Sequence, residues 1–122
     1  MNQHHQAQWD KVVPVKKINS EDGPEGGAVL LVPRFRWGPL ARWLQPRLRK
    51  PHIRVNLDGF GSFVWNSIDG KKNYNEILDA MRYEFSETLD KPEERLQKFF
   101  LILKKNEFVE LYKKEESISE LR

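Results

Sequence analysis

The side chains in the middle of the chain that could take part in catalysis are Asp58, Ser62 and Asp69. Each aspartate is followed by a glycine, and an Asp-Gly pair is typical of turns and helix caps, not of a general acid/base pair. Ser62 lacks the Gly-x-Ser-x-Gly context of a nucleophilic serine and has no paired base. The two glycines that flank Phe60 are too few for a phosphate-binding loop. We therefore predict that the protein has no catalytic residue and is not an enzyme.

The composition also argues against metal and thiol chemistry. The chain has no cysteine, which excludes disulfides, thiolate metal sites and a cysteine nucleophile. Two of its histidines, His4 and His5, are adjacent near the N-terminus, whereas His52 is far along the chain. No carboxylate at ligand spacing completes a site around any of them. We predict no metal and no cofactor.

Residues 34–51 form a basic, aromatic segment that is broken by prolines. From Arg34 to Arg54 the chain has seven arginine or lysine residues and no acid. Three interpretations remain open: a loop that folds over a sheet, a surface for an acidic protein or peptide, and attachment to a membrane surface or nucleic acid. The segment is short, which argues against stable membrane anchoring by it alone. Its candidate contact residues are Arg36, Trp37, Arg42, Trp43, Arg47 and Arg49.

Three segments have the composition of β-strands. Residues 15–19 are predicted to form a weak edge strand, and residues 28–33 are apolar on both faces, as in a central strand. Pro33 has no N–H group and is expected to end that central strand. Residues 20–27, between these two strands, have the composition of a turn. The third strand is predicted over 52–57.

The third strand alternates between apolar and polar residues, which predicts that one of its faces is buried. One face holds Ile53, Val55 and Leu57, and the other holds His52, Arg54 and Asn56. If the strand order follows the chain order, this strand lies at an edge of the sheet. Its unpaired N–H and C=O groups would then be available to a further strand.

Three helices are expected after the strands, over 59–68, 73–85 and 92–106. Asn73 precedes Glu76 by three residues, which is the spacing of a capping box. Pro92 suits a first helical turn, and Asn106 can adopt the left-handed conformation of a helix end. Residues 108–112 are an extended tail that can pack back. The expected core stripes are Phe60, Phe63, Val64 and Ile68; Tyr74, Ile77, Leu78, Met81 and Phe85; and Leu96, Phe99, Phe100 and Leu103.

These elements predict an α+β fold in which a small three-stranded antiparallel sheet is followed by a three-helix bundle. The expected organisation of the 122 residues is a flexible polar arm over 1–14, one domain over 15–112 and a charged tail over 113–122. The N-terminus lacks the apolar core of a signal peptide, and no apolar run approaches the roughly 20 residues of a membrane-spanning helix. We therefore expect a cytoplasmic protein.

Five short sequences follow one another in a characteristic order: Val29-Leu-Leu-Val-Pro33, Val55-Asn-Leu-Asp58, Phe63-Val-Trp65, Ile68-Asp-Gly70 and Asn106-Glu-Phe-Val109. This succession resembles the PqqD family, over residues 15–112. PqqD proteins are the peptide chaperones of pyrroloquinoline quinone biosynthesis, and the same fold recognises precursors in many pathways that modify ribosomal peptides. The chain departs from the family at 34–51, where a typical member turns quickly from its second strand to its third.

The resemblance implies a winged-helix-like fold that binds the leader segment of a precursor peptide. In the family the leader lies as an added strand beside the third strand, in a groove closed by the third helix. It is then presented to a partner enzyme, often a radical SAM protein. The basic side chains of the third helix suit an acidic leader, or alternatively form an ordinary solvated face. The implied peptide-binding residues are Ile53, Arg54, Val55, Asn56, Leu57, Arg95, Lys98, Phe99, Ile102 and Lys105.

The main alternative function is that of a winged-helix DNA-binding protein. Such a protein needs a recognition helix with several basic side chains. The third helix carries Lys104 as well as Arg95, Lys98 and Lys105. Glu93 and Glu94 begin the same helix, however, and the second helix carries further acids that would repel phosphate. The charge pattern therefore argues against DNA binding. An exposed edge strand can also pair with a second copy of the chain, so monomer and dimer both remain open.

Overall fold

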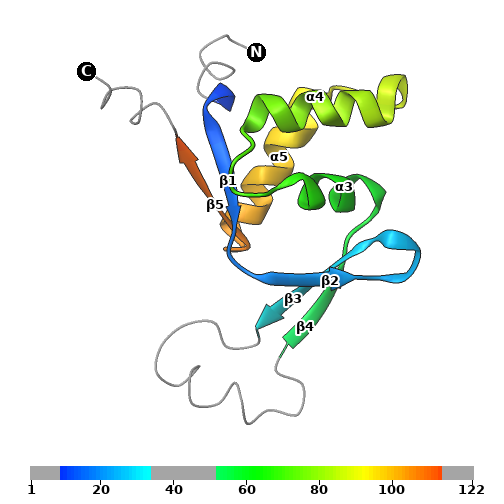
Figure 1. The fold of residues 1–122 in the computed structure, drawn as a ribbon, viewed down its shortest axis with the longest axis vertical. Helices are drawn as coiled ribbons and strands as arrows, with labels where there is room; N and C mark the ends of the chain where they lie inside the picture. The colour runs from blue at the N-terminus through cyan, green and yellow to red at the C-terminus, as the bar shows by residue number, and fades with distance from the viewer. Residues whose placement is uncertain (1–8, 34–51, 114–122) are drawn as a thin grey trace. The chain divides into compact units, whose positions relative to one another are not determined.

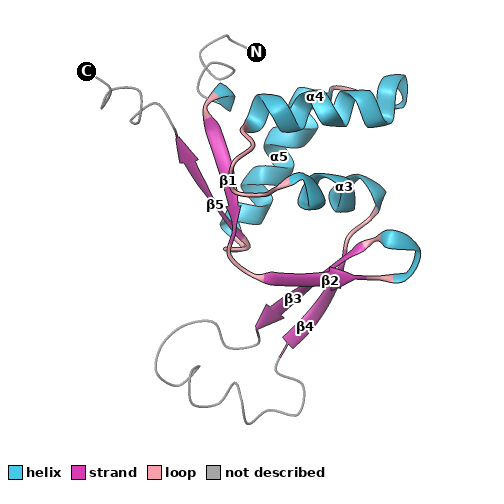
Figure 2. Ribbon diagram, in the orientation of Figure 1, coloured by secondary structure: helices cyan, strands magenta, loops and turns pink. Residues whose placement is uncertain are grey.

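The computed structural model describes residues 9–33 and 52–113. Over these residues the protein has an α+β fold with small antiparallel sheets and three α-helices, α3 (Gly59–Ser67), α4 (Tyr74–Phe85) and α5 (Pro92–Lys105) (Figure 1; Figure 2). The predicted α+β class, with antiparallel strands and three helices, is therefore confirmed. The described residues form two compact units, 9–17 with 63–113 and 18–33 with 52–62. No helix in these residues is long and apolar enough to cross a bilayer.

The unit formed by 18–33 and 52–62 contains a three-stranded antiparallel sheet. Its strands, in spatial order, are β2 (Asn19–Asp22), β3 (Ala28–Pro33) and β4 (His52–Asn56). The predicted central strand and its end at Pro33 are confirmed, and β4 matches its prediction to within one residue. The prediction of a first strand at 15–19 is wrong, because β3 pairs with 19–22 instead.

The turn between β2 and β3 is correspondingly shorter than predicted. It occupies 23–27, where Glu25 and Gly26 have φ angles of 63° and 81°. Both angles lie in the left-handed region, which lets the chain reverse direction within a few residues. Gly23 N–H donates to the Gly27 carbonyl at 2.6 Å and closes the turn.

The other unit contains a two-stranded antiparallel sheet of β1 (Val12–Lys16) and β5 (Val109–Lys113). The prediction of a polar arm over 1–14 is wrong for its last three residues, because 12–14 are buried in β1. The first eight residues of that arm lie outside the described part of the chain. Sequence periodicity missed β1 because Pro14 interrupts it.

The tail predicted at 108–112 does pack back, since it forms β5 against β1. β5 follows α5 in the chain, so the predicted order of one sheet followed by three helices is incomplete. The charged tail predicted over 113–122 lies outside the described residues beyond Lys113.

The three helices lie close to their predicted limits. They are α3 (Gly59–Ser67), α4 (Tyr74–Phe85) and α5 (Pro92–Lys105). The capping box is confirmed: the Asn73 side chain accepts from Glu76 N–H at 2.9 Å, and the Glu76 carboxylate accepts from Asn73 N–H at 2.8 Å. The prediction for the end of α5 is wrong by one residue. Asn106 has φ −87°, and Glu107 adopts the left-handed conformation with φ 63°.

The core of the unit formed by 9–17 and 63–113 is built from the helices together with Trp9. The Trp9 ring centroid lies 5.4 Å from that of Tyr74 and 6.1 Å from that of Phe100, and both of these partner rings are fully buried. Phe63 adds an edge-on contact with Phe85 at 5.6 Å. Buried members of the predicted stripes are Val64, Ile68, Tyr74, Ile77, Leu78, Met81, Leu96, Phe100 and Leu103.

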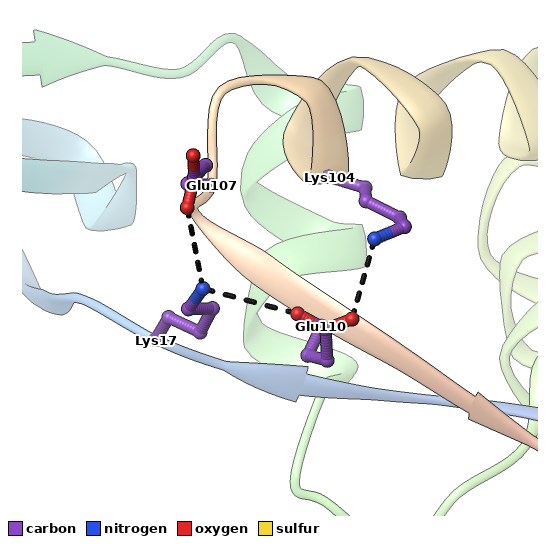
Figure 3. A network of polar contacts seen from close by, with 4 residues as sticks. All are labelled: Lys17, Lys104, Glu107 and Glu110. Carbon is purple, nitrogen blue, oxygen red and sulfur yellow. Dashed lines mark hydrogen bonds and ion pairs between the residues drawn. The ribbon is translucent and has the colours of Figure 1, made fainter.

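Four charged side chains form a network where α5 meets the two strands of this unit (Figure 3). Lys17 Nζ lies 3.5 Å from Glu107 Oε1 and 3.8 Å from Glu110 Oε1. The other carboxylate oxygen of Glu110, Oε2, lies 3.2 Å from Lys104 Nζ. All four side chains are partly exposed, so each pair contributes at most about 1 kcal/mol. The network therefore adds little to stability.

Replacing Ser86 with glycine should stabilise the protein by about 1 kcal/mol. Ser86 ends α4 with φ 54° and ψ −129°, a conformation that glycine adopts without steric cost. Urea unfolding followed by circular dichroism measures the change. Ser86→Ala is the matched control and should give no gain, because alanine is strained there as serine is. Equal effects of the two substitutions would contradict the backbone explanation.

Candidate functional site

The outer edge of β4 carries backbone groups that point away from the sheet. Leu57 N–H donates to the Ala28 carbonyl of β3 at 3.0 Å, which fixes the hydrogen-bonding phase of the strand. Because alternate residues of an antiparallel pair direct their backbone groups to the partner strand, the N–H and C=O groups of Ile53 and Val55 also face β3. The N–H and C=O groups of His52, Arg54 and Asn56 therefore face outward. Within the described residues β4 pairs with β3 alone.

The side chains of β4 give this edge a polar face and an apolar face. Arg54 and Asn56 are exposed on one face, where Arg54 pairs with Glu21 of β2 across the intervening strand. On the other face Val55 is half-buried, but Ile53 remains 46% exposed. The predicted half-buried strand is thus only partly correct, since the cover over its apolar face ends before Ile53.

Ser62 secures the inner side of β4. Its hydroxyl accepts a hydrogen bond from Ala28 N–H at 2.8 Å and donates one to the Leu57 carbonyl at 3.1 Å. The hydroxyl thus bridges the last pair of the β3–β4 ladder, and the residue is buried. The sequence context of Ser62 gave no signal of this role, because the bridge depends on how the first turn of α3 meets the strand ends.

Ser62→Ala should lower the free energy of unfolding by about 1–3 kcal/mol, because it leaves the buried Ala28 N–H without its acceptor. Ser67→Ala in the same helix is the control. The Ser67 hydroxyl donates only to the Phe63 carbonyl of the preceding turn, at 2.9 Å, and its loss should change stability by less than about 0.5 kcal/mol. Denaturant titration of both variants measures the difference. Equal losses would contradict the bridging role.

The other strand edges are less suited to accept a guest strand. On β1, Lys17 N–H donates to the Phe108 carbonyl at 2.8 Å, so the backbone of Lys17 faces β5. By alternation the backbone of Pro14 then faces outward, and proline has no N–H group to donate to a guest strand. On β2 only Ser20 and Asp22 face outward, and the strand is four residues long. The outer edge of β5 begins at Val109, which is 1% exposed. β4 is therefore the most open edge of the described sheets.

The predicted site residues on the third helix lie along one side of α5. Arg95, Lys98, Ile102 and Lys105 are exposed, with Ile102 at 53%, whereas Phe99 is half-buried. Leu101 is also 53% exposed and was missed, because its position lies just outside the predicted stripe. A surface hollow at the start of this side is lined by Asp90, Lys91, Glu94, Arg95 and Lys98.

The structure therefore groups the predicted peptide-binding residues into two surfaces. Residues 53–57 belong to the unit of the three-stranded sheet, and the α5 residues belong to the other unit. The six predicted contact residues of the basic segment, from Arg36 to Arg49, lie outside the described residues.

Asp58 and Asp69 have the turn and cap roles that their Asp-Gly context predicts. The Asp58 carboxylate accepts from Gly61 N–H at 2.7 Å, at the start of α3. The Asp69 carboxylate accepts from Lys72 N–H at 2.8 Å and Lys71 N–H at 2.9 Å. These bonds lower the pKa of Asp69, and the bond from Lys72 N–H has the larger effect. Among the described residues no three histidine, aspartate or glutamate side chains gather into a potential metal site.

Comparison of this chain with protein-family models, with curated proteins and with solved structures gives no match. The functional interpretation therefore depends on the geometry above and on the sequence resemblance.

Proposed function

We propose that this protein is a non-catalytic peptide-recognition protein of the PqqD type, which binds the leader segment of a precursor peptide by strand addition. The observation that carries the proposal is the open edge of β4, where Arg54 and Asn56 direct their N–H and C=O groups outward. An extended peptide can satisfy these groups by pairing with the strand. Main-chain hydrogen bonds then supply affinity, and alternate side chains supply specificity.

The side chains along β4 suggest the chemistry of the guest. A peptide paired with this edge places its alternate side chains on the two faces of the sheet. On one face they meet Arg54, which can exchange its ion pair with Glu21 for one with an acid of the guest. On the other face they meet the exposed Ile53, which favours an apolar residue. The α5 surface combines the same two features, since Lys98 and Lys105 flank the exposed Ile102. The guest is thus a strand of alternating acidic and apolar residues.

The remaining parts of the proposal come from the resemblance. The fold is winged-helix-like, and the bound leader is presented to a peptide-modifying enzyme of the radical SAM class, in the cytoplasm. The α5 residues Arg95, Lys98, Phe99, Ile102 and Lys105 contribute to leader binding. The basic segment 34–51 is a surface for the partner enzyme or for the acidic part of the leader.

The test is an NMR titration of the ¹⁵N-labelled full chain with synthetic peptides of alternating acidic and apolar residues. We expect the largest amide shifts at Arg54 and Asn56, with further shifts at Lys98 and Ile102. A peptide of the same composition in scrambled order is the control and should bind more weakly. Shifts that leave β4 unchanged would contradict strand addition. Tight binding of random duplex DNA that falls steeply with salt would instead support the DNA-binding alternative.

A further inference from the structure

We propose that the outer edge of β4 also pairs with β4 of a second copy of this chain, antiparallel, about a two-fold axis at Val55. The inference uses the same open edge as the proposed function, but it does not require a peptide ligand. Two identical edges brought together by a two-fold axis form a closed, self-complementary dimer. The register of such a pair can be derived from the residues of β4.

The outward-facing residues limit the registers that a second copy can adopt. Within the described residues, the outward-facing N–H and C=O groups of Arg54 and Asn56 have no strand partner, so these residues must lie opposite residues with the same orientation. An axis at Arg54 places this residue directly against the partner's Arg54, and the ion pair that each makes with Glu21 of its own chain offsets the repulsion between these like charges only in part. An axis at Ile53 draws on residues before His52 and leaves Asn56 without a described partner.

An axis at Val55 avoids both problems. Arg54 then lies opposite the partner's Asn56, and the reverse pair is made by symmetry, with two backbone hydrogen bonds for each pair. On the apolar face, Ile53 lies opposite the partner's Leu57, and Val55 meets its own copy. Ile53 is 46% exposed in the single chain, so this register covers the most exposed apolar side chain of the sheet.

Self-pairing has a consequence for the peptide site. The N–H and C=O groups of Arg54 and Asn56 can bind either a guest strand or a second copy, but not both. A peptide that binds β4 therefore dissociates the dimer. The dimer in turn protects the open edge from non-specific strand addition when no peptide is present.

The test changes the charge at residue 56 and measures self-association of the full chain by sedimentation velocity over a concentration series. Asn56→Glu places an acid against Arg54 twice in each dimer and should tighten the dimer by about three- to tenfold at low salt. Asn56→Arg should weaken it by a similar factor. Tyr83→Glu and Tyr83→Arg, at a position on α4 that is 87% exposed, are controls for net charge and should have no effect. A monomer at all concentrations up to the millimolar range would overturn the inference, as would a dimer that ignores the charge at 56.

A parallel titration with the acidic, apolar peptide separates this inference from the proposed function. The same substitutions should change peptide affinity in the opposite direction, since Asn56→Arg attracts an acidic guest and Asn56→Glu repels it. Peptide binding without any self-association would overturn the dimer alone. Self-association that follows the charge at 56, without peptide binding, would support the dimer and contradict the proposed function.

Discussion

Replacing Asn56 with proline is expected to weaken peptide binding by about 5- to 150-fold, or about 1–3 kcal/mol, while leaving the sheet folded. The Asn56 N–H points away from β3, so proline removes no hydrogen bond within the β3–β4 pair. It does remove one that a guest strand needs, and the guest carbonyl is left without a donor. Proline on an outer edge is also a device by which natural sheets refuse additional strands. Fluorescence anisotropy with a labelled acidic, apolar peptide measures the loss.

The matched control for this substitution is Val55→Pro, one residue earlier. The Val55 N–H faces β3 and belongs to the ladder, so its removal should destabilise the sheet itself by about 3 kcal/mol or more. The two variants therefore separate binding from folding: position 56 should lose peptide and keep its circular dichroism spectrum, and position 55 should lose the fold. Unchanged peptide affinity in Asn56→Pro would show that the guest does not add to this edge.

Local sequence patterns predicted the elements in which neighbouring residues determine structure. The capping box at Asn73 and the helical stripe from Tyr74 to Met81 depend on residues three or four apart, and both are present. The apolar run of β3 and its end at Pro33 are equally local, because a proline cannot donate to the ladder.

The features that the sequence did not predict depend on residues distant in the chain. β1 pairs with β5, about a hundred residues later, so the local sequence of neither strand indicates its partner. Trp9 was assigned to a polar arm by the composition around it, yet its ring packs against Tyr74 and Phe100. Tertiary packing here overrides the local signal.

The candidate site was predictable in part for the same reason. Alternation along 52–57 identified a strand with Arg54 and Asn56 on one face, and the pairing with β3 supports that assignment. Alternation cannot show how far the cover over the apolar face extends, so the exposure of Ile53 was missed. Nor could it reveal that the Ser62 hydroxyl bridges the strand ends, since that requires the fold.

Phe100→Ala should lower the free energy of unfolding by about 3–5 kcal/mol. Phe100 is fully buried, and its ring lies 6.1 Å from Trp9 and 6.4 Å from Tyr74. The truncation therefore opens a cavity in the helical core and removes contacts that hold the segment before β1. Phe99→Ala is the neighbouring control: Phe99 is only half-buried, so its loss should be clearly smaller in urea unfolding and should act more on peptide affinity. A double-mutant cycle with Trp9→Ala should give a coupling of about 0.5–1.5 kcal/mol with Phe100. A coupling near zero would show that Trp9 does not pack on this ring in solution, and that residue 9 belongs with the polar arm after all.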